Sequence, residues 1–258
     1  MNRPTLRTAA PVLLLALLPL AACGNDDDAD AGSADGELSG SITVAAAASL
    51  TETFEELAEQ FEAEHDGVEV DLVFDSSGTL ADQAAEGAPG DVLATADLRS
   101  MERAADAQAD EPVVFATNDL VLVTPADNPA DVTGIDSLDG ADVTYVVCVE
   151  TAPCGGLAAE ALAEAGVERE PASLEPDVKA TLSRVVEDEA DAGLVYRTDA
   201  LAAGDDVQEI DLPERLTTEY PIVLLDQSRN AAVARAFIDF VLSTAGADVL
   251  TAAGFGTP

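Results

Sequence analysis

Basic residues and histidine are scarce in this chain of 258 residues. Lysine and arginine total 11 against 51 aspartates and glutamates, which gives a formal net charge of −40. A strongly negative surface repels nucleic acid and anionic membrane surfaces, so we exclude both as partners. The one histidine, His65, stands beside Asp66 and Gly67 at a predicted helix end. Without a second histidine or a cysteine cluster, we expect no zinc chemistry.

Sequence motifs of enzymes are also missing. The chain has no G-x-S-x-G nucleophile elbow, no phosphate-binding P-loop and no dinucleotide fingerprint. Carboxylates are so numerous that a pair of them carries no specific signal of acid–base catalysis. We therefore expect neither an enzyme nor a cofactor. A surface enzyme acting on small anions is the alternative from another class.

The N-terminal segment has the pattern of a lipoprotein signal peptide. A basic start is followed by an apolar run, Val12 to Leu20, that is too short to cross a bilayer as a helix. The run leads to the letters L-A-A-C, which resemble the lipobox of bacterial lipoproteins and imply cleavage before Cys23 and acylation of its thiol. We predict a signal peptide over 1–22 and a lipidated, acidic tether over 23–40. An ordinary secretory signal with an incidental cysteine is the alternative.

Two further cysteines, Cys148 and Cys154, belong to the mature chain. An even pair of cysteines in an exported protein indicates a disulfide, and this one would pin the loop 151–153. Two buried thiols are the alternative.

Strand-like and helix-like segments alternate through the mature chain. Short apolar or β-branched segments predict strands, and apolar residues at helical spacing predict helices between them. Repeated strand–helix units indicate an α/β fold in which mixed, mostly parallel sheets are flanked by helices. The expected strands cover 42–46, 68–74, 91–96, 120–123, 143–149, 193–196 and 222–225. The expected helices begin near Ser49, Ser77, Ser100, Pro153, Asp177 and Ala231, and a short one precedes Gly254.

Several of these helices begin directly after a strand. Ser49-Leu50-Thr51-Glu52 has the spacing of a capping box, in which the serine oxygen accepts a helix N–H and the glutamate reaches back. Ser77, the Pro153-Cys154-Gly155 turn and the Asp177-Val178 start are further points of this kind. Each helix N-terminus offers free N–H donors and partial positive charge, and ligands of open α/β sheets bind where strand ends meet helix starts. The pattern suits an anion, and simple capping of each helix is the alternative.

Three blocks of the sequence resemble periplasmic molybdate-binding proteins. They are VAAAASLTETFEELAEQFE, FDSSGTLADQAAEGAPGDVLATAD and PDVKATLSRVVEDEADAGLVYRTDA, and the likeness extends over 41–258. The resemblance implies the two-lobed type II binding-protein fold, with lobe I over 41–117 and 223–258 and lobe II over 118–222. It also implies a monomeric extracytoplasmic protein that captures molybdate for the permease and ATPase of an ABC transporter. Molybdenum would be bound only as molybdate.

The resemblance also assigns the ligand contacts. Ser49 and Ser77 would each donate a hydroxyl from lobe I. The amides of Cys154 and Val178 and the phenol of Tyr196 would donate from lobe II. Neutral donors suit a fully deprotonated dianion, whereas hydrogen phosphate needs an acceptor for its proton. Tungstate has nearly the same size and charge, so the sequence does not separate it from molybdate; sulfate is a smaller rival.

Two residues depart from the family pattern. Cys154 replaces a small residue of the family's P-A-G turn, which keeps the amide but draws the loop into the expected disulfide. Asp75 precedes the Ser76-Ser77 pair where a small residue is common. We expect the Asp75 carboxylate to point away from the site. A structural surface lipoprotein without a ligand is the remaining alternative.

Overall fold

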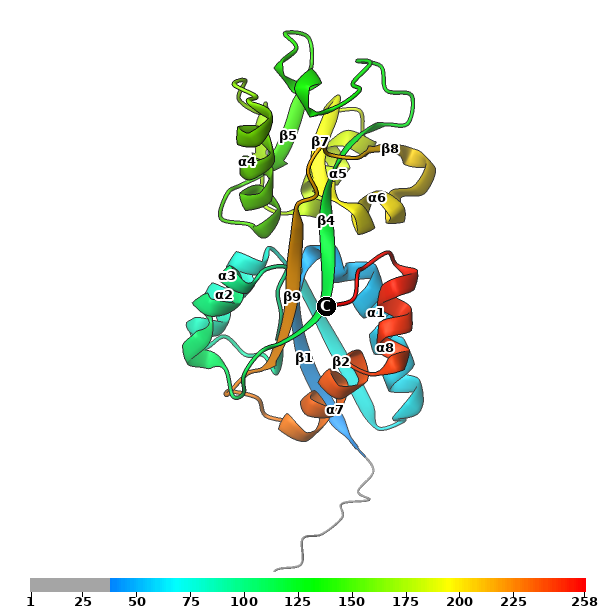
Figure 1. Ribbon diagram of the computed structural model, residues 1–258. Helices are drawn as coiled ribbons and strands as arrows, with labels where there is room; N and C mark the ends of the chain where they lie inside the picture. The colour runs from blue at the N-terminus through cyan, green and yellow to red at the C-terminus, as the bar shows by residue number, and fades with distance from the viewer. Residues whose placement is uncertain (1–37) are drawn as a thin grey trace, which may run out of the picture. The chain divides into compact units, whose positions relative to one another are not determined.

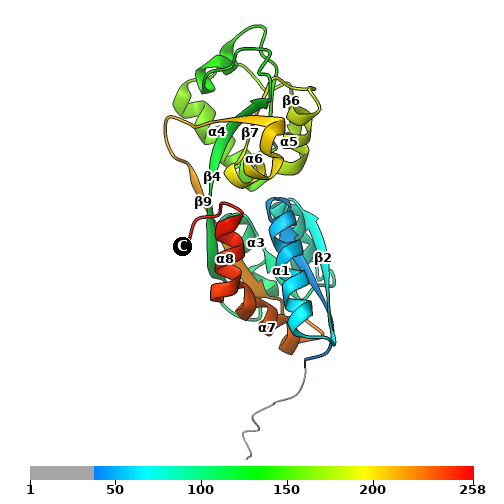
Figure 2. The same cartoon turned by 90° about the vertical axis from the view of Figure 1, so that its right-hand side faces the viewer.

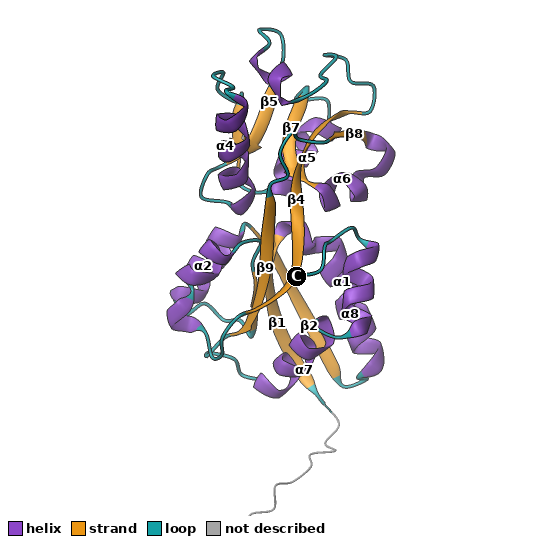
Figure 3. Cartoon of the chain, viewed as in Figure 1, coloured by secondary structure: helices purple, strands orange, loops and turns teal. Residues whose placement is uncertain are grey.

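The computed structural model describes residues 38–258; the predicted signal peptide, Cys23 and most of the tether lie outside that range. The strands of the described chain are β1 (Gly40–Ala47), β2 (Val68–Asp75), β3 (Val92–Ala94), β4 (Val113–Pro125), β5 (Tyr145–Cys148), β6 (Ser173–Glu175), β7 (Ala192–Tyr196), β8 (Val207–Ile210) and β9 (Thr217–Leu224). The helices are α1 (Thr51–Glu64), α2 (Ser77–Ala85), α3 (Leu98–Arg103), α4 (Pro153–Ala165), α5 (Val178–Val186), α6 (Arg197–Ala203), α7 (Ala231–Val241) and α8 (Thr244–Ala252). The predicted α/β class is confirmed, since helices flank one mixed sheet (Figure 3).

The sheet holds two parallel sets of strands joined by antiparallel ones. Its order is β2-β1-β3-β9-β4-β7-β5-β6, with β8 paired to β4. Strands β1, β2 and β3 are parallel, and so are β5, β6 and β7. The three pairings between the sets, β3–β9, β9–β4 and β4–β7, are antiparallel. The two parallel sets therefore run in opposite directions.

Strand β4 determines where the two sets meet. Its first part, Val113–Asp119, pairs with β9, and its second part, Leu120–Val123, pairs with β7. We call β1–β3 with α1–α3, α7 and α8 the first half, and β5–β8 with α4–α6 the second half. Figure 1 shows the helices of each half around their own strands, with β4 and β9 running between the halves. Because the sets are antiparallel and lie at opposite ends of β4, the carboxyl ends of both sets point to the middle of this strand.

The core of the first half is built on aromatic side chains from the two ends of the chain. Phe61 and Phe237 lie 5.4 Å apart between ring centroids, and Phe54 and Phe237 lie 6.2 Å apart. Phe54 and Phe61 come from α1, and Phe237 comes from α7, so these helices pack together (Figure 2). A smaller core cluster under α2 and α3 contains Leu80, Leu93 and Met101.

Several elements differ from the sequence-based prediction. Strand β4 is much longer than the expected 120–123, and the short strands β6 and β8 and helix α6 were not predicted. The predicted capping box is wrong. Leu50 occupies the N-cap of α1, no side chain caps that helix, and Ser49 lies in a preceding 3-10 turn, Ala48–Leu50. By contrast, the carboxylate of Asp177 caps α5 as predicted, accepting the amide of Ala180 at 2.9 Å.

Within residues 38–258, no helix combines the length and the apolar character needed to cross a membrane.

Candidate functional site

A small hollow lies where the carboxyl ends of the two parallel sets meet. Its volume is about 10 Å³, close to the space that one water molecule requires. A hollow of this size leaves no room for a sugar or a peptide. Its lining residues come from both halves and from every helix start that the sequence analysis singled out: Ala47, Ala48, Ser49, Ser76, Ser77, Ala96, Ala152, Pro153, Cys154, Asp177, Val178 and Tyr196.

The first half contributes two buried serines. Ser49 follows β1, and its Oγ lies 2.8 Å from the phenol oxygen of Tyr220. Ser77 is the first residue of α2, and its Oγ accepts the amide of Ala96 at 2.9 Å. Neither hydroxyl caps its own helix, contrary to the capping interpretation. Both side chains line the hollow instead.

The second half contributes helix starts. Cys154 is the second residue of α4, and Val178 is the first residue of α5. The first amides of a helix have no partner within the helix, so they can bind an acceptor, and the helix dipole favours a negative one. The five residues assigned by resemblance, Ser49, Ser77, Cys154, Val178 and Tyr196, therefore all line one hollow.

A disulfide joins Cys148 to Cys154. It closes the connection from β5 into α4, which includes two lining residues, Ala152 in the loop and Pro153 at the first position of α4. The predicted pairing of these cysteines is confirmed, and the bridge ties one wall of the hollow to the end of a buried strand.

The phenol of Tyr196 stands out in the lining. Tyr196 is only 1% exposed, and its hydroxyl has no hydrogen-bond partner among the described residues. Burial, followed by the nearby phenol of Tyr220, raises the pKa of Tyr196 well above its ordinary value. The phenol therefore stays protonated at neutral pH. A buried hydroxyl without a partner costs free energy, which a ligand that accepts its proton would recover.

Two aspartates lie near the serines and helix starts. Asp177 lines the hollow, and its Oδ1 is occupied as the cap of α5. Asp75 is not among the lining residues, and its Oδ1 accepts the amide of Ser76 at 2.6 Å.

Lys179, the next residue after Val178, adds no free positive charge. Its ammonium lies 2.7 Å from Glu52 and 3.1 Å from the buried carboxylate of Asp199. Opposite charges on both sides neutralise the lysine, so the donors of the hollow are hydroxyls and amides.

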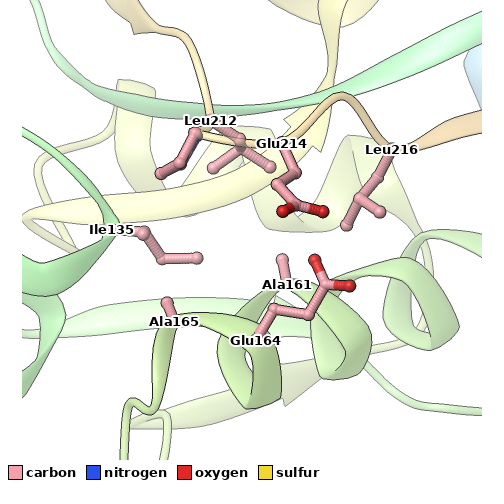
Figure 4. Close-up of a pocket in the computed structure, with 8 residues that line it drawn as sticks. Ile135, Ala161, Glu164, Ala165, Leu212, Glu214 and Leu216 are labelled. Carbon is pink, nitrogen blue, oxygen red and sulfur yellow. The ribbon is translucent and has the colours of Figure 1, made fainter.

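A larger hollow elsewhere has the wrong chemistry for an anion. It has a volume of about 140 Å³ between α4 and the segment that leads into β9. Figure 4 shows the carboxylates of Glu164 and Glu214 pointing toward each other from opposite walls, with the apolar side chains of Ile135 and Leu212 to one side of them. Two carboxylates repel an oxyanion, so the small hollow is the better candidate. Among residues 38–258, no group of three or more histidine, cysteine, aspartate or glutamate side chains is arranged to hold a metal ion.

Sequence reasoning missed the partners of the serines. Tyr220 lies on β9 and Asn118 on β4, far from any predicted motif, and Asn118 Nδ2 lies 3.4 Å from the Tyr220 oxygen. Their approach to Ser49 depends on the antiparallel pairing of β4 and β9, which no local pattern in the sequence signals.

Comparison with known proteins gives consistent results. A family model described as bacterial extracellular solute-binding protein matches residues 42–256. The molybdate-binding protein ModA of Mycobacterium tuberculosis H37Rv is 36% identical over 243 residues, which cover 93% of this chain and 93% of that protein. The Bacillus subtilis 168 protein YvgL, provisionally named an ABC transporter substrate-binding lipoprotein, is 26% identical over 250 residues, or 94% of this chain and 95% of YvgL. Among solved structures, the periplasmic molybdate-binding protein of Azotobacter vinelandii aligns with a TM-score of 0.75 at 21% identity, covering 84% of this chain and 99% of that one.

Proposed function

Because the chain belongs to the bacterial extracellular solute-binding protein family, we propose that it captures molybdate and delivers it to an ABC transporter. The M. tuberculosis relative named for molybdate binding is 36% identical along almost the whole of both chains. The observation that carries the proposal is the buried phenol of Tyr196, which has no partner among the described residues and lines the same hollow as Ser49 and Ser77.

The chemistry of the hollow fits a tetrahedral dianion. The hydroxyls of Ser49, Ser77 and Tyr196 supply three donors, and the amides of Cys154 and Val178 supply two more at helix starts. A fully deprotonated oxyanion has four oxygens that only accept hydrogen bonds, so it matches a set of neutral donors. Donors of this kind act at short range, while salt screens the distant carboxylates of the −40 chain.

Capture proceeds, in this proposal, by closure of two lobes on the ligand. Residues 41–117 and 223–258 form lobe I, residues 118–222 form lobe II, and β4 and β9 are the crossings between them. Lobe I supplies two donors to the ligand and lobe II supplies three. Binding therefore favours the closed arrangement, in which both sets reach the ligand, over an open one. The permease of the transporter then recognises the closed form.

The protein works at the outer face of the cell membrane in this proposal. Acylation of Cys23 anchors it there, and the tether 23–40 gives the folded part its reach. A Cys23→Ser variant would move the protein from the membrane fraction of the expressing cells to the medium or periplasm. Retention of that variant in the membrane fraction would contradict the lipid anchor.

Tungstate and sulfate are the competing ligands. Tungstate shares the size and charge of molybdate, so we expect the two to bind alike. Sulfate has the same charge but is smaller, so discrimination against it would depend on the spacing of the donors.

Calorimetric titration with molybdate, tungstate, sulfate and phosphate tests the function. We expect tight binding of the first two and loss of both in a Ser49→Ala/Ser77→Ala double variant. A matched control changes two hydroxyls away from the hollow, the exposed Thr133 and the half-buried Ser137, each to alanine, and should bind like the wild type. Absence of heat with all four anions would overturn the proposal, and preference for sulfate would replace its ligand.

A further inference from the structure

A buried chain of polar side chains runs from Ser49 away from the hollow. The Ser49 hydroxyl lies 2.8 Å from the phenol oxygen of Tyr220. Asn118 Nδ2 lies 3.4 Å from that phenol oxygen and 2.8 Å from the hydroxyl of Thr198. All four residues are at most 5% exposed, so they are shielded from bulk solvent. The direction in which each proton points is therefore set by the chain itself.

The orientation of Asn118 is fixed by a neighbouring amide. Asn118 Oδ1 accepts the backbone N–H of Asp119 at 3.0 Å. Exchanging the oxygen and nitrogen of the amide would place two donors against each other, so Nδ2 must face Tyr220 and Thr198. An amide nitrogen can only donate.

The direction of the next hydrogen bond follows from this. Because Asn118 donates to the phenol oxygen, the proton of Tyr220 has one remaining partner, Ser49. In the opposite arrangement Ser49 would donate to Tyr220, and the phenol proton would stay buried without an acceptor, at a cost in free energy. Tyr220 thus donates to Ser49, and the proton of Ser49 is left for the hollow. Burial raises the pKa of Tyr220, so this donor persists across the neutral and alkaline range.

Ser77 is held in the same way by a different donor. Its oxygen accepts the amide of Ala96 at 2.9 Å, which leaves its proton for the hollow. Both serines of the first half therefore offer a proton to a ligand and have a lone pair already occupied. A ligand that carries its own proton meets a serine proton at both residues and only one remaining lone pair on each serine oxygen.

We propose that Tyr220, oriented by Asn118, is a positioning residue that fixes Ser49 as a hydrogen-bond donor and so selects fully deprotonated oxyanions over protonated ones. This inference rests on the proposed capture of an oxyanion and names a residue that determines its specificity. Tyr220 does not line the hollow, so it acts through Ser49.

The Tyr220→Phe variant tests the proposal, because it removes the phenol hydroxyl and keeps the ring that packs against Tyr196 and Phe255. We expect the Kd for molybdate to rise by up to about tenfold, which is the loss when Ser49 no longer directs its hydrogen bond to the charged ligand. We also expect the ratio of the phosphate Kd to the molybdate Kd, measured at pH 8, to fall, because Ser49 regains a free lone pair. Tyr145→Phe is the matched control: this buried tyrosine donates to the carbonyl of Arg169, away from the hollow.

A double-mutant cycle separates positioning from a general effect on folding. Molybdate Kd values are measured for the wild type, Ser49→Ala, Tyr220→Phe and the double variant. If Tyr220 acts through Ser49, adding Tyr220→Phe to Ser49→Ala changes the Kd less than twofold. Equal losses in both backgrounds, or an unchanged ratio of phosphate to molybdate affinity, would overturn the positioning role. A wild-type protein that binds no oxyanion would instead overturn the proposed function, so the two failures are distinct.

Discussion

The ammonium of Lys179 lies 2.7 Å from Oε1 of Glu52, although 127 residues separate the two along the chain. Glu52 lies in the first turn of α1, three residues after Ser49, and Lys179 is the second residue of α5, next to Val178. The ion pair therefore joins the two halves at the edge of the hollow. The same ammonium contacts the buried carboxylate of Asp199 in α6 at 3.1 Å. No other lysine occurs in the sequence.

Loss of this ion pair should speed release of the ligand. If the ligand is held between the halves, Glu52→Gln weakens the closed arrangement and raises the dissociation rate of molybdate about two- to fivefold, the range expected for a partly exposed pair. Stopped-flow measurements at low salt give the rate, and the effect should shrink at 1 M salt. Glu59→Gln, on the exposed side of the same helix, makes the same change in net charge and should leave the rate unchanged. Equal rates in both variants would show that the pair does not hold the halves together.

Asp199 should make the stability of the protein depend on pH. Burial raises the pKa of its carboxyl from 3.8 to about 6, against the opposing effect of Lys179. The folded protein thus holds this proton more tightly than the unfolded chain does. The stabilising contribution of the proton is complete below pH about 4 and is lost as the pH rises to about 6 and above, by about 3 kcal/mol.

The comparison with Asp199→Asn isolates this effect from the other carboxylates. We expect the free energy of unfolding of the wild type, minus that of the variant, to fall as the pH rises from 4 to 7. Denaturant titrations at four pH values measure both. A difference that stays constant over this range would contradict the raised pKa of Asp199.

Tyr196 and Tyr220 should respond oppositely to loss of their hydroxyls. The Tyr196 hydroxyl has no partner among residues 38–258, so Tyr196→Phe should leave the free energy of unfolding unchanged or raise it by up to about 1 kcal/mol. The same variant should weaken molybdate binding about tenfold, because the ligand loses a donor.

Tyr220→Phe breaks the hydrogen bonds to Ser49 and Asn118, and it should lower the free energy of unfolding. Denaturant unfolding without ligand checks the pair; a destabilised Tyr196→Phe would mean that its phenol has a partner in the free protein.

The start of α4 should tolerate a side chain at Gly156 but not at Gly155. A Cβ on Gly155 would lie 2.0 Å from the carbonyl oxygen of Val149, whereas a Cβ on Gly156 has 3.9 Å of room. The disulfide between Cys148 and Cys154 keeps the backbone of this loop from moving aside. Gly155→Ala should therefore cost about 1 to 3 kcal/mol of stability and weaken anion binding through the displaced Cys154 amide.

Gly156→Ala is the matched control for that variant. It should be neutral or stabilising by up to about 1 kcal/mol, since alanine favours a helix over glycine. Thermal unfolding and calorimetric titration of both variants give the comparison, and equal behaviour would contradict the close approach at Gly155.

Local patterns in the sequence predicted most strands and helices and the fold class, because apolar periodicity and turn residues are local signals. Strand β4 is longer than predicted because Thr117, Asn118 and Asp119 interrupt its apolar run. Asn118 and Asp119 are buried and have hydrogen-bond partners on other elements. Strands β6 and β8 are too short and too polar to give a signal. Helix α6 begins directly after β7, without a turn or a capping side chain to mark it.

The candidate site shows the same division between local and distant information. Its helix starts were visible as strand–turn–helix units, and the resemblance to binding proteins named five of the residues that line the hollow. The capping box failed because both of its side chains have partners far along the chain: Ser49 contacts Tyr220, and Glu52 contacts Lys179. The capping-box pattern considers only residues that are close in sequence. It therefore cannot predict that a hydrogen bond to a distant strand replaces the local one.

The aromatic core of the first half has a consequence for biosynthesis. Phe54 and Phe61 leave the ribosome early, but their partner Phe237 lies near the C-terminus, so this core cannot close until almost the whole chain has been made. Residues 118–222, in contrast, are contiguous and hold every strand and helix of the second half. The leading part of the nascent chain thus lacks the helix that completes its core until synthesis is nearly finished, which favours the incompletely folded state that a translocation pore accepts.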